Sequence, residues 1–395
     1  MIERTFGYDQ VVTEVANTEP AEATQDSTPD DRASDRKVIA HIDADAFYAT
    51  VHLVEDPSLA GKPVIVAGQG MRSIVTTASY EARKYGVHSA MPATQARRLC
   101  PHAIFLRPNF DLYRAYSRRA MAIVQEYVHT IEPLSLDEAY LDVTELERPI
   151  ATLREMVARI HEETGLRYSV GIGPNKLCAK VLSDHRKPAA FNVASREQCC
   201  ELFGTESPKL INGIGPKTVA ALADLGIDTI AVLREFDHGR LAARFGERRA
   251  GELQALARFD HRGRVHRDRG VKSVSEERTF EVDVDDLEEL AERMRDLAID
   301  LCGRLERKHL QGRTIGIKVR LDDFTTVTRA RTISDRTNDP LVVSRVADEL
   351  LRDYDPPQPV RLIGVRVAAF DDLRSADADG GGAAAQQLQL PIAQA

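Results

Sequence analysis

The sequence predicts a multidomain α+β protein in which two βαββαβ units flank a region of short helices. Three observations support this class. The chain has 395 residues, more than a single growing hydrophobic core usually accommodates. Apolar runs that suit strands alternate with amphipathic segments in residues 38–200, and the same order returns in residues 272–371. Between the two units, glycine and proline divide the chain into short segments.

The first unit begins with the apolar run Val38–Ile42, which predicts a buried strand with Asp43 at its end. Its later elements are, in chain order, a long amphipathic helix after Asn109, strands over 131–134 and 139–143, a helix over 149–164, a strand over 168–172 and a helix opened by Pro174. The paired strands predict a hairpin that carries Asp137 and Glu138 at its tip.

Residues 48–107 form an insertion within this unit. Strands are predicted over 64–67 and 73–76. Ser79 predicts the N-cap of a helix that stops at Gly86, and Pro92 opens a further helix.

The second half of the chain begins with short helices over 207–235, around Gly213 and Gly215. A basic stretch over 260–271 is typical of a linker. The second unit then consists of a strand over 272–280, a helix over 287–308, strands over 314–321 and 325–333, a helix over 340–352 and a strand over 360–369.

The net charge of −8 is concentrated in the two ends of the chain. Residues 1–36 hold nine acidic and three basic residues, and their composition predicts a disordered extension. Residues 372–395 hold three acidic and one basic residue and predict a flexible tail. The body between them is about neutral, with basic clusters over 262–272 and 304–336 that could neutralise phosphates or form a solvated charged face.

Several classes of protein are disfavoured by composition. No apolar run reaches 18 residues and the start lacks a basic region followed by an apolar one, so we expect a soluble, cytoplasmic protein. The five cysteines are an odd number without a C-x-x-C pair, which argues against a disulfide framework and a cysteine zinc site.

The acidic residues suggest metal chemistry. In-line displacement at a phosphate can use two divalent cations about 4 Å apart, and Mg²⁺ prefers carboxylate and phosphate oxygens. Asp43 at a strand end and the hairpin residues Asp137 and Glu138 could supply the carboxylates. Adjacent strand residues face opposite ways, so the last two can share a site only if a turn or bulge redirects one of them. Each acid alone could equally be a solvated turn residue.

Six blocks of sequence together resemble the Y family of translesion DNA polymerases, of the bacterial DNA polymerase IV type. They occur in the family's order and span most of residues 38–370. The blocks are Ile42-Asp43-Ala44-Asp45-Ala46-Phe47-Tyr48-Ala49, Ala78-Ser79-Tyr80-Glu81-Ala82-Arg83-Lys84-Tyr85-Gly86-Val87, Ser89-Ala90-Met91-Pro92, Ser135-Leu136-Asp137-Glu138-Ala139-Tyr140-Leu141-Asp142, Gly171-Ile172-Gly173-Pro174-Asn175-Lys176 and Lys272-Ser273-Val274.

The resemblance implies low-fidelity, template-directed DNA synthesis from deoxynucleoside triphosphates without proofreading, by two-metal-ion chemistry. Asp43, Asp137 and Glu138 are then the catalytic residues and, with the Ala44 carbonyl, hold two Mg²⁺ ions, with Mn²⁺ as an alternative. Asp45 and Asp142 are interpreted as structural.

The resemblance also implies a triphosphate site. Tyr48 matches the family's steric gate against a 2′-hydroxyl, although its spacing fits a core aromatic equally well. Tyr80 and Arg83 are three residues apart on one helix face, which lets both reach one ligand. The family uses this pair on the β- and γ-phosphates, with Lys187 as a further phosphate ligand and Thr77 as a polar contact beside them. Without the resemblance, these would be interpreted as surface ion pairs.

Three further segments are expected to bind macromolecules. Gly213, Gly215 and Lys217 resemble a helix-hairpin-helix that contacts DNA phosphates, the alternative being a plain interhelical turn. The second unit, including Arg329 and Arg331, is expected to grip DNA. Gln387-Leu388-Gln389-Leu390-Pro391-Ile392 resembles the peptide that docks bacterial polymerases on the sliding clamp, the alternative being an inert tail.

We expect a right-hand arrangement that works as a monomer. Its predicted parts are the palm (37–47 and 108–200), fingers (48–107), thumb (201–262), linker (263–271), little finger (272–371) and clamp-binding tail (372–395). One departure from the family concerns the loop after Lys187-Pro188, where Ala189-Ala190 stand near a frequent glycine position.

Two other functions use the same features. A non-catalytic adaptor of the same fold could bind DNA and recruit another polymerase to the clamp, but retention of the acids and of the predicted phosphate ligands argues against it. A nucleotide cyclase could place similar acids on a hairpin, but it has no use for the thumb-like helices or for the clamp-like tail.

Overall fold

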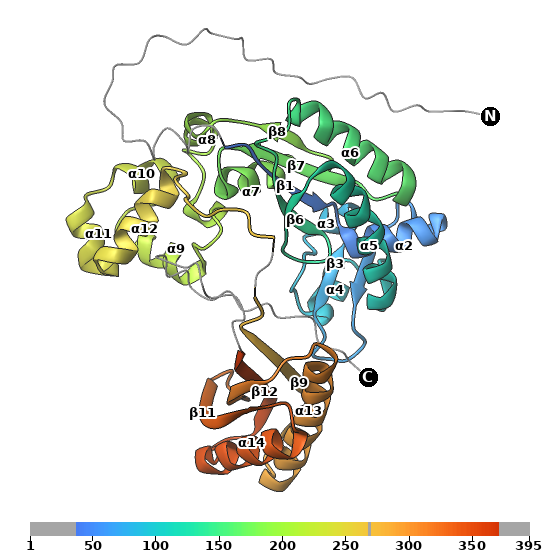
Figure 1. The fold of residues 1–395 in the computed structure, drawn as a ribbon, viewed down its shortest axis with the longest axis vertical. Helices are drawn as coiled ribbons and strands as arrows, with labels where there is room; N and C mark the ends of the chain where they lie inside the picture. Colours follow the sequence, from blue (N-terminus) through green and yellow to red (C-terminus); the bar gives the residue numbers. More distant parts are fainter. Residues whose placement is uncertain (1–36, 268–269, 371–395) are drawn as a thin grey trace.

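The structure is a computed structural model that describes residues 37–267 and 270–370. Residues 1–36 and 371–395, with the predicted extension and clamp peptide, lie outside the described residues. The chain folds into a mixed sheet with helices, a smaller sheet beside it, a helical region, and a second mixed unit (Figure 1). The predicted multidomain α+β class is confirmed.

The palm sheet has the order β5-β6-β1-β7-β8. Its strands are β1 (Ile39–Ala44), β5 (Thr130–Pro133), β6 (Glu138–Asp142), β7 (Tyr168–Gly173) and β8 (Phe191–Val193). The central strand β1 pairs antiparallel with both β6 and β7, and β7 pairs parallel with β8. Because β1 is enclosed on both edges, its last residues are fixed by two ladders.

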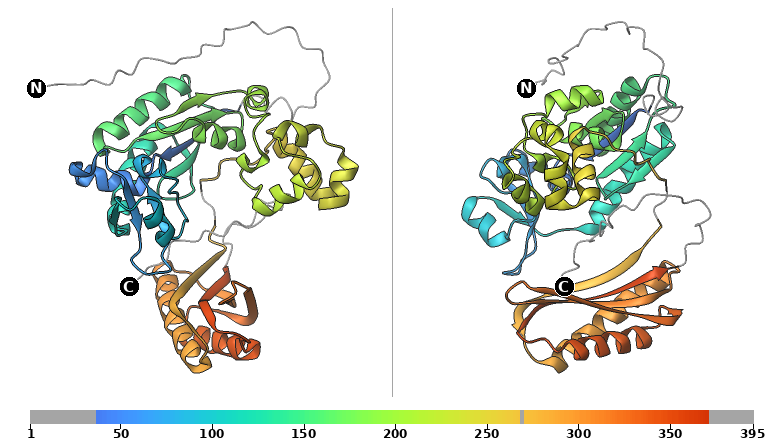
Figure 2. Two further views of the ribbon diagram at one scale, coloured as in Figure 1. Left: turned by 180° about the vertical axis from the view of Figure 1, so that it is seen from behind. Right: turned by 90° about the vertical axis from the view of Figure 1, so that its left-hand side faces the viewer.

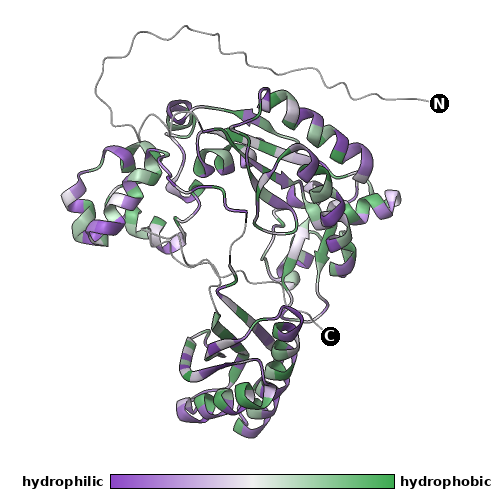
Figure 3. Cartoon of the chain, viewed as in Figure 1, coloured by the Kyte–Doolittle hydropathy of each residue, from purple (hydrophilic) through white to green (hydrophobic). Residues whose placement is uncertain are grey.

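Helices cover both faces of this sheet. On one face, α2 (Phe47–Glu55), α5 (Phe110–Tyr127) and α6 (Pro149–Thr164) pack on alternate residues of the strands, including Ala40 and Ile42 of β1. Figure 3 shows the hydrophilic residues of α6 along its outer side. On the other face lies α7 (Lys176–Asp184), which contacts β1 and β7. Since strand residues alternate between faces, His41 and Asp43 lie on the face toward α7.

Glycine lets α7 approach the sheet closely. A Cβ atom added at Gly171 of β7 would lie 2.1 Å from the Ala179 carbonyl oxygen and 2.2 Å from the Ser183 nitrogen. Only a residue without a side chain fits between strand and helix at this position. The close contact brings the side chains of α7 over the end of β1.

A three-stranded sheet follows α2. It has the order β3-β2-β4, from β2 (Val64–Ala67), β3 (Val75–Ala78) and β4 (Ile104–Leu106). It carries the short helices α3 (Tyr80–Arg83) and α4 (Ala93–Leu99) over a small apolar core of its own. As predicted, the Ser79 hydroxyl caps α3 by accepting from the Ala82 N–H, and Gly86 ends the turn at φ 81°.

A helical region continues from the palm. Its elements are α8 (Arg196–Leu202), the 3-10 helix η2 (Pro208–Leu210), α9 (Pro216–Ala223), α10 (Ile230–Glu235), α11 (His238–Phe245) and α12 (Glu247–Ala257). Its apolar core includes Leu177 and Leu182 of α7, so the helical region and the palm sheet share that helix. The segment after it is held on the palm, because Val265 packs on Ile39 and the His266 N–H donates to Glu132.

The second unit has the order β11-β10-β12-β9, with all neighbours antiparallel. Its elements are β9 (Ser273–Val284), α13 (Leu287–Arg307), β10 (Gly312–Leu321), β11 (Thr326–Thr337), α14 (Pro340–Tyr354) and β12 (Val360–Phe370). Both helices lie on one face and leave the other open (Figure 2). The loop between β2 and β3 contacts this unit through Arg72, whose guanidinium pairs with Asp283 at 2.6 Å.

Candidate active site

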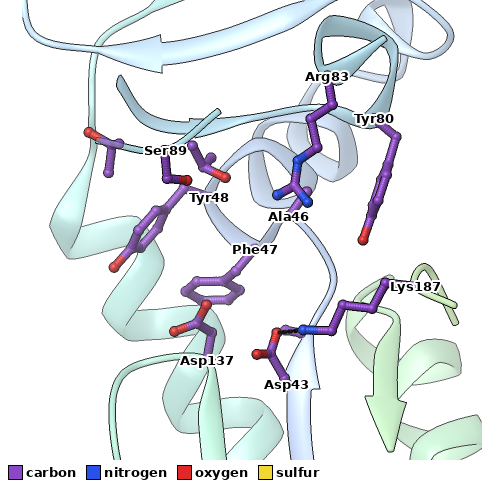
Figure 4. Close-up of a pocket in the computed structure, with 12 residues that line it drawn as sticks. Asp43, Ala46, Phe47, Tyr48, Tyr80, Arg83, Ser89, Asp137 and Lys187 are labelled. Atoms are coloured by element: carbon purple, nitrogen blue, oxygen red, sulfur yellow. Dashed lines mark ion pairs between the residues drawn. The ribbon is translucent and has the colours of Figure 1, made fainter. Parts of the chain in front are cut away.

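A cavity of about 230 Å³ lies between the palm sheet and the three-stranded sheet (Figure 4). All the residues predicted to bind metal or triphosphate, except Glu138, line it: Asp43, Ala44, Tyr48, Thr77, Tyr80, Arg83, Asp137 and Lys187. In Figure 4, Lys187 reaches Asp43 from one side, and Arg83 and Tyr80 extend toward the same space from α3. The structure therefore gathers side chains that are up to 144 positions apart in the sequence.

Asp43 and Glu138 lie side by side across the β1–β6 ladder, as a directly paired couple. Two ammonium groups neutralise them. Lys180 Nζ lies 3.3 Å from Asp43 Oδ2 and 2.9 Å from Glu138 Oε2, and Lys187 Nζ lies 2.9 Å from Asp43 Oδ1. Burial opposes the positive charges, but the surrounding carboxylates outweigh it and raise the pKa values of Lys180 and Lys187.

His41 supports Glu138 from beneath. This fully buried imidazole places Nε2 3.4 Å from Glu138 Oε2, and its Nδ1 lies 2.8 Å from the Ser183 hydroxyl. The Ser183 hydroxyl also lies 2.8 Å from the Lys180 carbonyl. Burial alone would favour a neutral Glu138, but the contacts with His41 and Lys180 lower its pKa to about 2. Glu138 is therefore held as a carboxylate.

Asp137 lies in a turn just before β6. The Ser135 hydroxyl accepts from the backbone N–H groups of Asp137 and Glu138, and the Ala44 N–H donates to the Asp137 carbonyl at 3.0 Å. This turn redirects Asp137 into the cavity while Glu138 stays in the ladder. Burial and the neighbouring charges of Asp43 and Glu138 raise the pKa of Asp137 to about 6, although a hydrogen bond from Ser135 opposes the shift.

Tyr48 lies in the first turn of α2 and faces the cavity. The chain turns sharply from β1 into this helix at Ala46, whose φ of 46° is left-handed and costs a non-glycine residue about 1 kcal/mol. The Tyr48 ring packs on Tyr113 at 4.5 Å and on Phe110 at 6.0 Å between centroids. Burial raises the pKa of Tyr48 to about 12, so its phenol is neutral and its ring is tightly supported.

The helix α3 presents Tyr80 and Arg83 together. The Arg83 guanidinium lies 4.7 Å from the centroid of the Tyr80 ring, and its Nε donates to the Ala78 carbonyl at 3.0 Å. The nearby Thr77 is buried at the end of β3. The remaining guanidinium nitrogens of Arg83 face the cavity (Figure 4), with the forked geometry that suits phosphate oxygens.

Asp45 links α3 to the loop after Lys187, which fits its interpretation as a structural residue. Its carboxylate accepts from the Ser169 hydroxyl and from the Ala189 N–H, both at 2.7 Å, and from the Tyr80 hydroxyl at 3.2 Å. Ala189 is left-handed at φ 53°, whereas Ala190 has no positive φ and its N–H donates to Ser169. Alanine at position 190 therefore fits the loop without strain.

The carboxylates suit a hard divalent cation in their chemistry. Their ligand atoms are all oxygens. The charges of Asp43 and Glu138 both raise the pKa of Asp137. Within residues 37–267 and 270–370, no group of three His, Cys, Asp or Glu side chains is close enough to hold an ion as it stands. Two of the three acids are drawn toward lysines instead.

The predicted DNA-binding residues lie elsewhere. Gly213 and Gly215 lie in the turn before α9, where Gly213 has a φ of 97° that favours glycine, and Lys217 is exposed. Arg329 and Arg331 lie on the edge strand β11, opposite Ile317 and Ile315, and so point to the helix side of that sheet. Arg331 pairs there with Glu349 and Asp353 of α14.

The sequence reasoning missed four groups around the acids: His41, Lys180, Ser183 and Asp184. One signal was available for His41, because residues two apart on a strand share a face with Asp43. For the others, the signal was weaker. Lys180, Asp184 and Lys187 are spaced by four and three, so they suggest one helix face, but not that α7 lies against β1.

The chain matches known proteins over most of its length. The model of the impB/mucB/samB family matches residues 42–184, and the model of its C-terminal domain matches residues 271–387. The DNA polymerase IV of Halorhodospira halophila is 43% identical over 348 residues, covering 85% of this chain and 95% of that protein. The DNA polymerase IV of Neisseria meningitidis serogroup A is 41% identical, with 85% and 96% covered.

Solved structures show the same architecture. A chimera of the Y-family DNA polymerases Dbh and Dpo4 superposes with a TM-score of 0.76 at 26% identity, covering 84% of this chain and 99% of that chain. An insertion ternary complex of Dbh DNA polymerase gives a TM-score of 0.61 with the same coverage.

Fold and site together define a polymerase of the Y family, with the right-hand architecture that the sequence predicted. Within this class, the chain belongs to the impB/mucB/samB family, and relatives that match it over most of its length are DNA polymerases IV. Among the helices of the described residues, none is long and apolar enough to cross a membrane.

Proposed function

We propose that this protein, whose relatives are named DNA polymerase IV, is a DNA-directed DNA polymerase that carries out low-fidelity translesion synthesis. The observation that carries the proposal is that one cavity holds both sets of residues. The acids Asp43 and Asp137 lie there together with Tyr80, Arg83 and Lys187, whose side chains can bind a triphosphate. Acids on one side and cations with hydroxyls on the other are what joining a nucleotide to a primer requires.

Asp43, Asp137, Glu138 and the Ala44 carbonyl would hold divalent cations, for which we propose two Mg²⁺ ions, with Mn²⁺ also accepted. When bound, such ions activate the primer hydroxyl and neutralise the charge that develops on the phosphates. The protein's own contribution is positional. The β1–β6 ladder sets the distance between Asp43 and Glu138, and the Ser135 turn aims Asp137.

The triphosphate would lie along α3 and the loop around Lys187. Arg83 can grip two phosphate oxygens at once, and Lys187 adds a mobile point charge. Asp45 orients this wall, because it binds both the Tyr80 hydroxyl and the Ala189 N–H. Tyr48 would lie beneath the sugar and exclude a 2′-hydroxyl.

For the parts of the chain, we propose the palm, fingers, thumb and little finger within the boundaries given above. The helix α2 spans the boundary between palm and fingers. It begins the predicted fingers, but its residues Phe47, Ala49 and Val51 pack in the palm core. DNA phosphates would meet the thumb at Gly213, Gly215 and Lys217, where no side chain caps α9 and its N–H groups can serve an anion. In the little finger, Arg329 and Arg331 would act from the edge strand.

The activity is tested by primer extension with the four deoxynucleotides and Mg²⁺ on an undamaged primer-template. We expect extension that follows the template, is abolished by a chelator and returns with Mg²⁺. Single deoxynucleotides on four templates check templating, and a template with an abasic site checks bypass. Failure to extend with Mg²⁺ or with Mn²⁺, while DNA binding persists, would favour the adaptor function.

The tail peptide, residues 387–392, is proposed to dock a monomeric polymerase on the sliding clamp in the cytoplasm. A glutamine followed by apolar anchors suits a preformed groove. Deletion of residues 386–395 should leave synthesis without clamp unchanged and remove most of the stimulation by clamp. A second variant, in the full-length chain, replaces Leu388 and Leu390 by alanine and should lose the stimulation as well. Persisting stimulation in both variants would show that docking lies elsewhere.

A further inference from the structure

Lys180 holds a distinctive place among the cations of the site, because it bridges two of the proposed metal ligands. Its ammonium lies 3.3 Å from Asp43 Oδ2 and 2.9 Å from Glu138 Oε2, on the face of the palm sheet that α7 covers. Any ion shared by these two carboxylates must therefore lie beside the ammonium or displace it. Repulsion between like charges at such short range is large in a partly buried site, and the Lys180 side chain is only 19% exposed.

A third anion is within reach of the same ammonium. Asp184 lies one turn further along α7, with Oδ2 3.6 Å from Lys180 Nζ. Its other oxygen accepts from Lys187 at 2.7 Å. Lysine has a long, flexible side chain, so a small rotation could carry its charge from the carboxylate pair toward Asp184. The helix backbone need not move, and it is held against Gly171 of β7 in any case.

We infer that Lys180 is a resident counter-cation that competes with divalent ions for Asp43 and Glu138, and that Asp184 receives its ammonium as an ion binds. The inference rests on the proposed function, because it takes these acids to be metal ligands. It assigns Lys180 a positioning role: the lysine keeps the carboxylates from repelling one another and sets how tightly the protein alone holds a metal ion. Tight binding would then come only with the nucleotide, whose phosphates bring further negative charge.

The two residues should have opposite effects on metal affinity. Lys180→Met removes the competing charge while keeping the length of the side chain, and we expect it to bind Mn²⁺ roughly tenfold more tightly than wild type. Asp184→Asn removes the alternative partner and leaves the ammonium on the carboxylate pair, so we expect Mn²⁺ binding several-fold weaker. Lys180→Arg keeps the charge and should stay close to wild type.

The experiment is a Mn²⁺ titration of the full-length protein without DNA or nucleotide, followed by electron paramagnetic resonance of the free ion. Lys318→Met is a matched control, because Lys318 is 18% exposed, pairs with Glu277 at 2.7 Å and lies in the second unit; its binding should equal that of wild type. Circular dichroism verifies that each variant is folded.

The outcomes separate this inference from the proposed function. Tighter binding by Lys180→Met with weaker binding by Asp184→Asn supports it, including the case in which only Lys180→Met binds measurably. Equal or weaker binding by folded Lys180→Met overturns it, even if primer extension by wild type is normal. If the wild-type protein fails to extend a primer, the proposed function is overturned instead.

Discussion

Primer extension by the Asp137→Ala, Glu138→Ala variant should fall by about a thousandfold or more. Metal-ion stabilisation of a phosphoryl transition state is worth several kcal/mol, and about 4 kcal/mol corresponds to a factor of about 10³ in rate. The variant keeps Asp43 but removes the redirected carboxylate of the Ser135 turn and the carboxylate paired with Asp43 across the ladder. Single-turnover extension on saturating primer-template measures the effect.

The variant must be folded and bound to DNA for this result to be informative. Removal of Glu138 leaves His41 and Lys180 with one partner fewer, so thermal unfolding should be recorded beside the rate. Asp142→Asn is the matched control, because Asp142 ends the same strand and its side chain accepts hydrogen bonds from Thr144. Extension within tenfold of wild type by the double variant would mean that other residues carry the chemistry.

Ribonucleotide incorporation by Tyr48→Ala should rise by about a hundredfold relative to deoxynucleotide incorporation. A steric clash worth about 3 kcal/mol corresponds to that ratio. The Tyr48 ring cannot easily turn aside, since Tyr113 and Phe110 pack against it from the palm. Paired measurements of kcat/KM for a deoxynucleotide and its ribonucleotide, opposite the same template base, give the ratio.

Tyr48→Phe separates the ring from its hydroxyl. It keeps the packing and should discriminate as wild type does, since the bulk of the ring excludes the 2′-hydroxyl. If Tyr48→Ala keeps the selectivity of wild type while remaining folded, the aromatic ring serves only as packing between α2 and α5.

Local chemistry made much of the fold predictable. The helix over Pro149–Thr164 follows from a proline at its first turn and from Gly165 just after its end, which adopts a φ of 72°. Asn109 caps α5 through its side chain, as expected for the residue before a long amphipathic run. Strands such as β2 could be predicted because they are short and entirely apolar.

What the sequence could not supply was the packing of distant elements. The helix after Pro174 was expected, but its N-cap is Asn175, and nothing in its own residues indicates that Lys180 lies over Asp43. Arg329 and Arg331 look like free cations in the sequence. Only the register of β11 with β10 shows that they share a face with Ile317 and Ile315.

The apolar cores carry a consequence for how this molecule unfolds. The core of the second unit contains only residues of 274–370, whereas the helical region draws Leu177 and Leu182 from α7, which also lies on the palm sheet. Palm and helical region should therefore lose structure together, because α7 cannot leave one without exposing the other. The second unit is attached by a chain segment and by contacts such as that of Arg72 with Asp283. On heating or in denaturant, the protein should then unfold in at least two cooperative steps. No single free energy of unfolding therefore describes the whole chain.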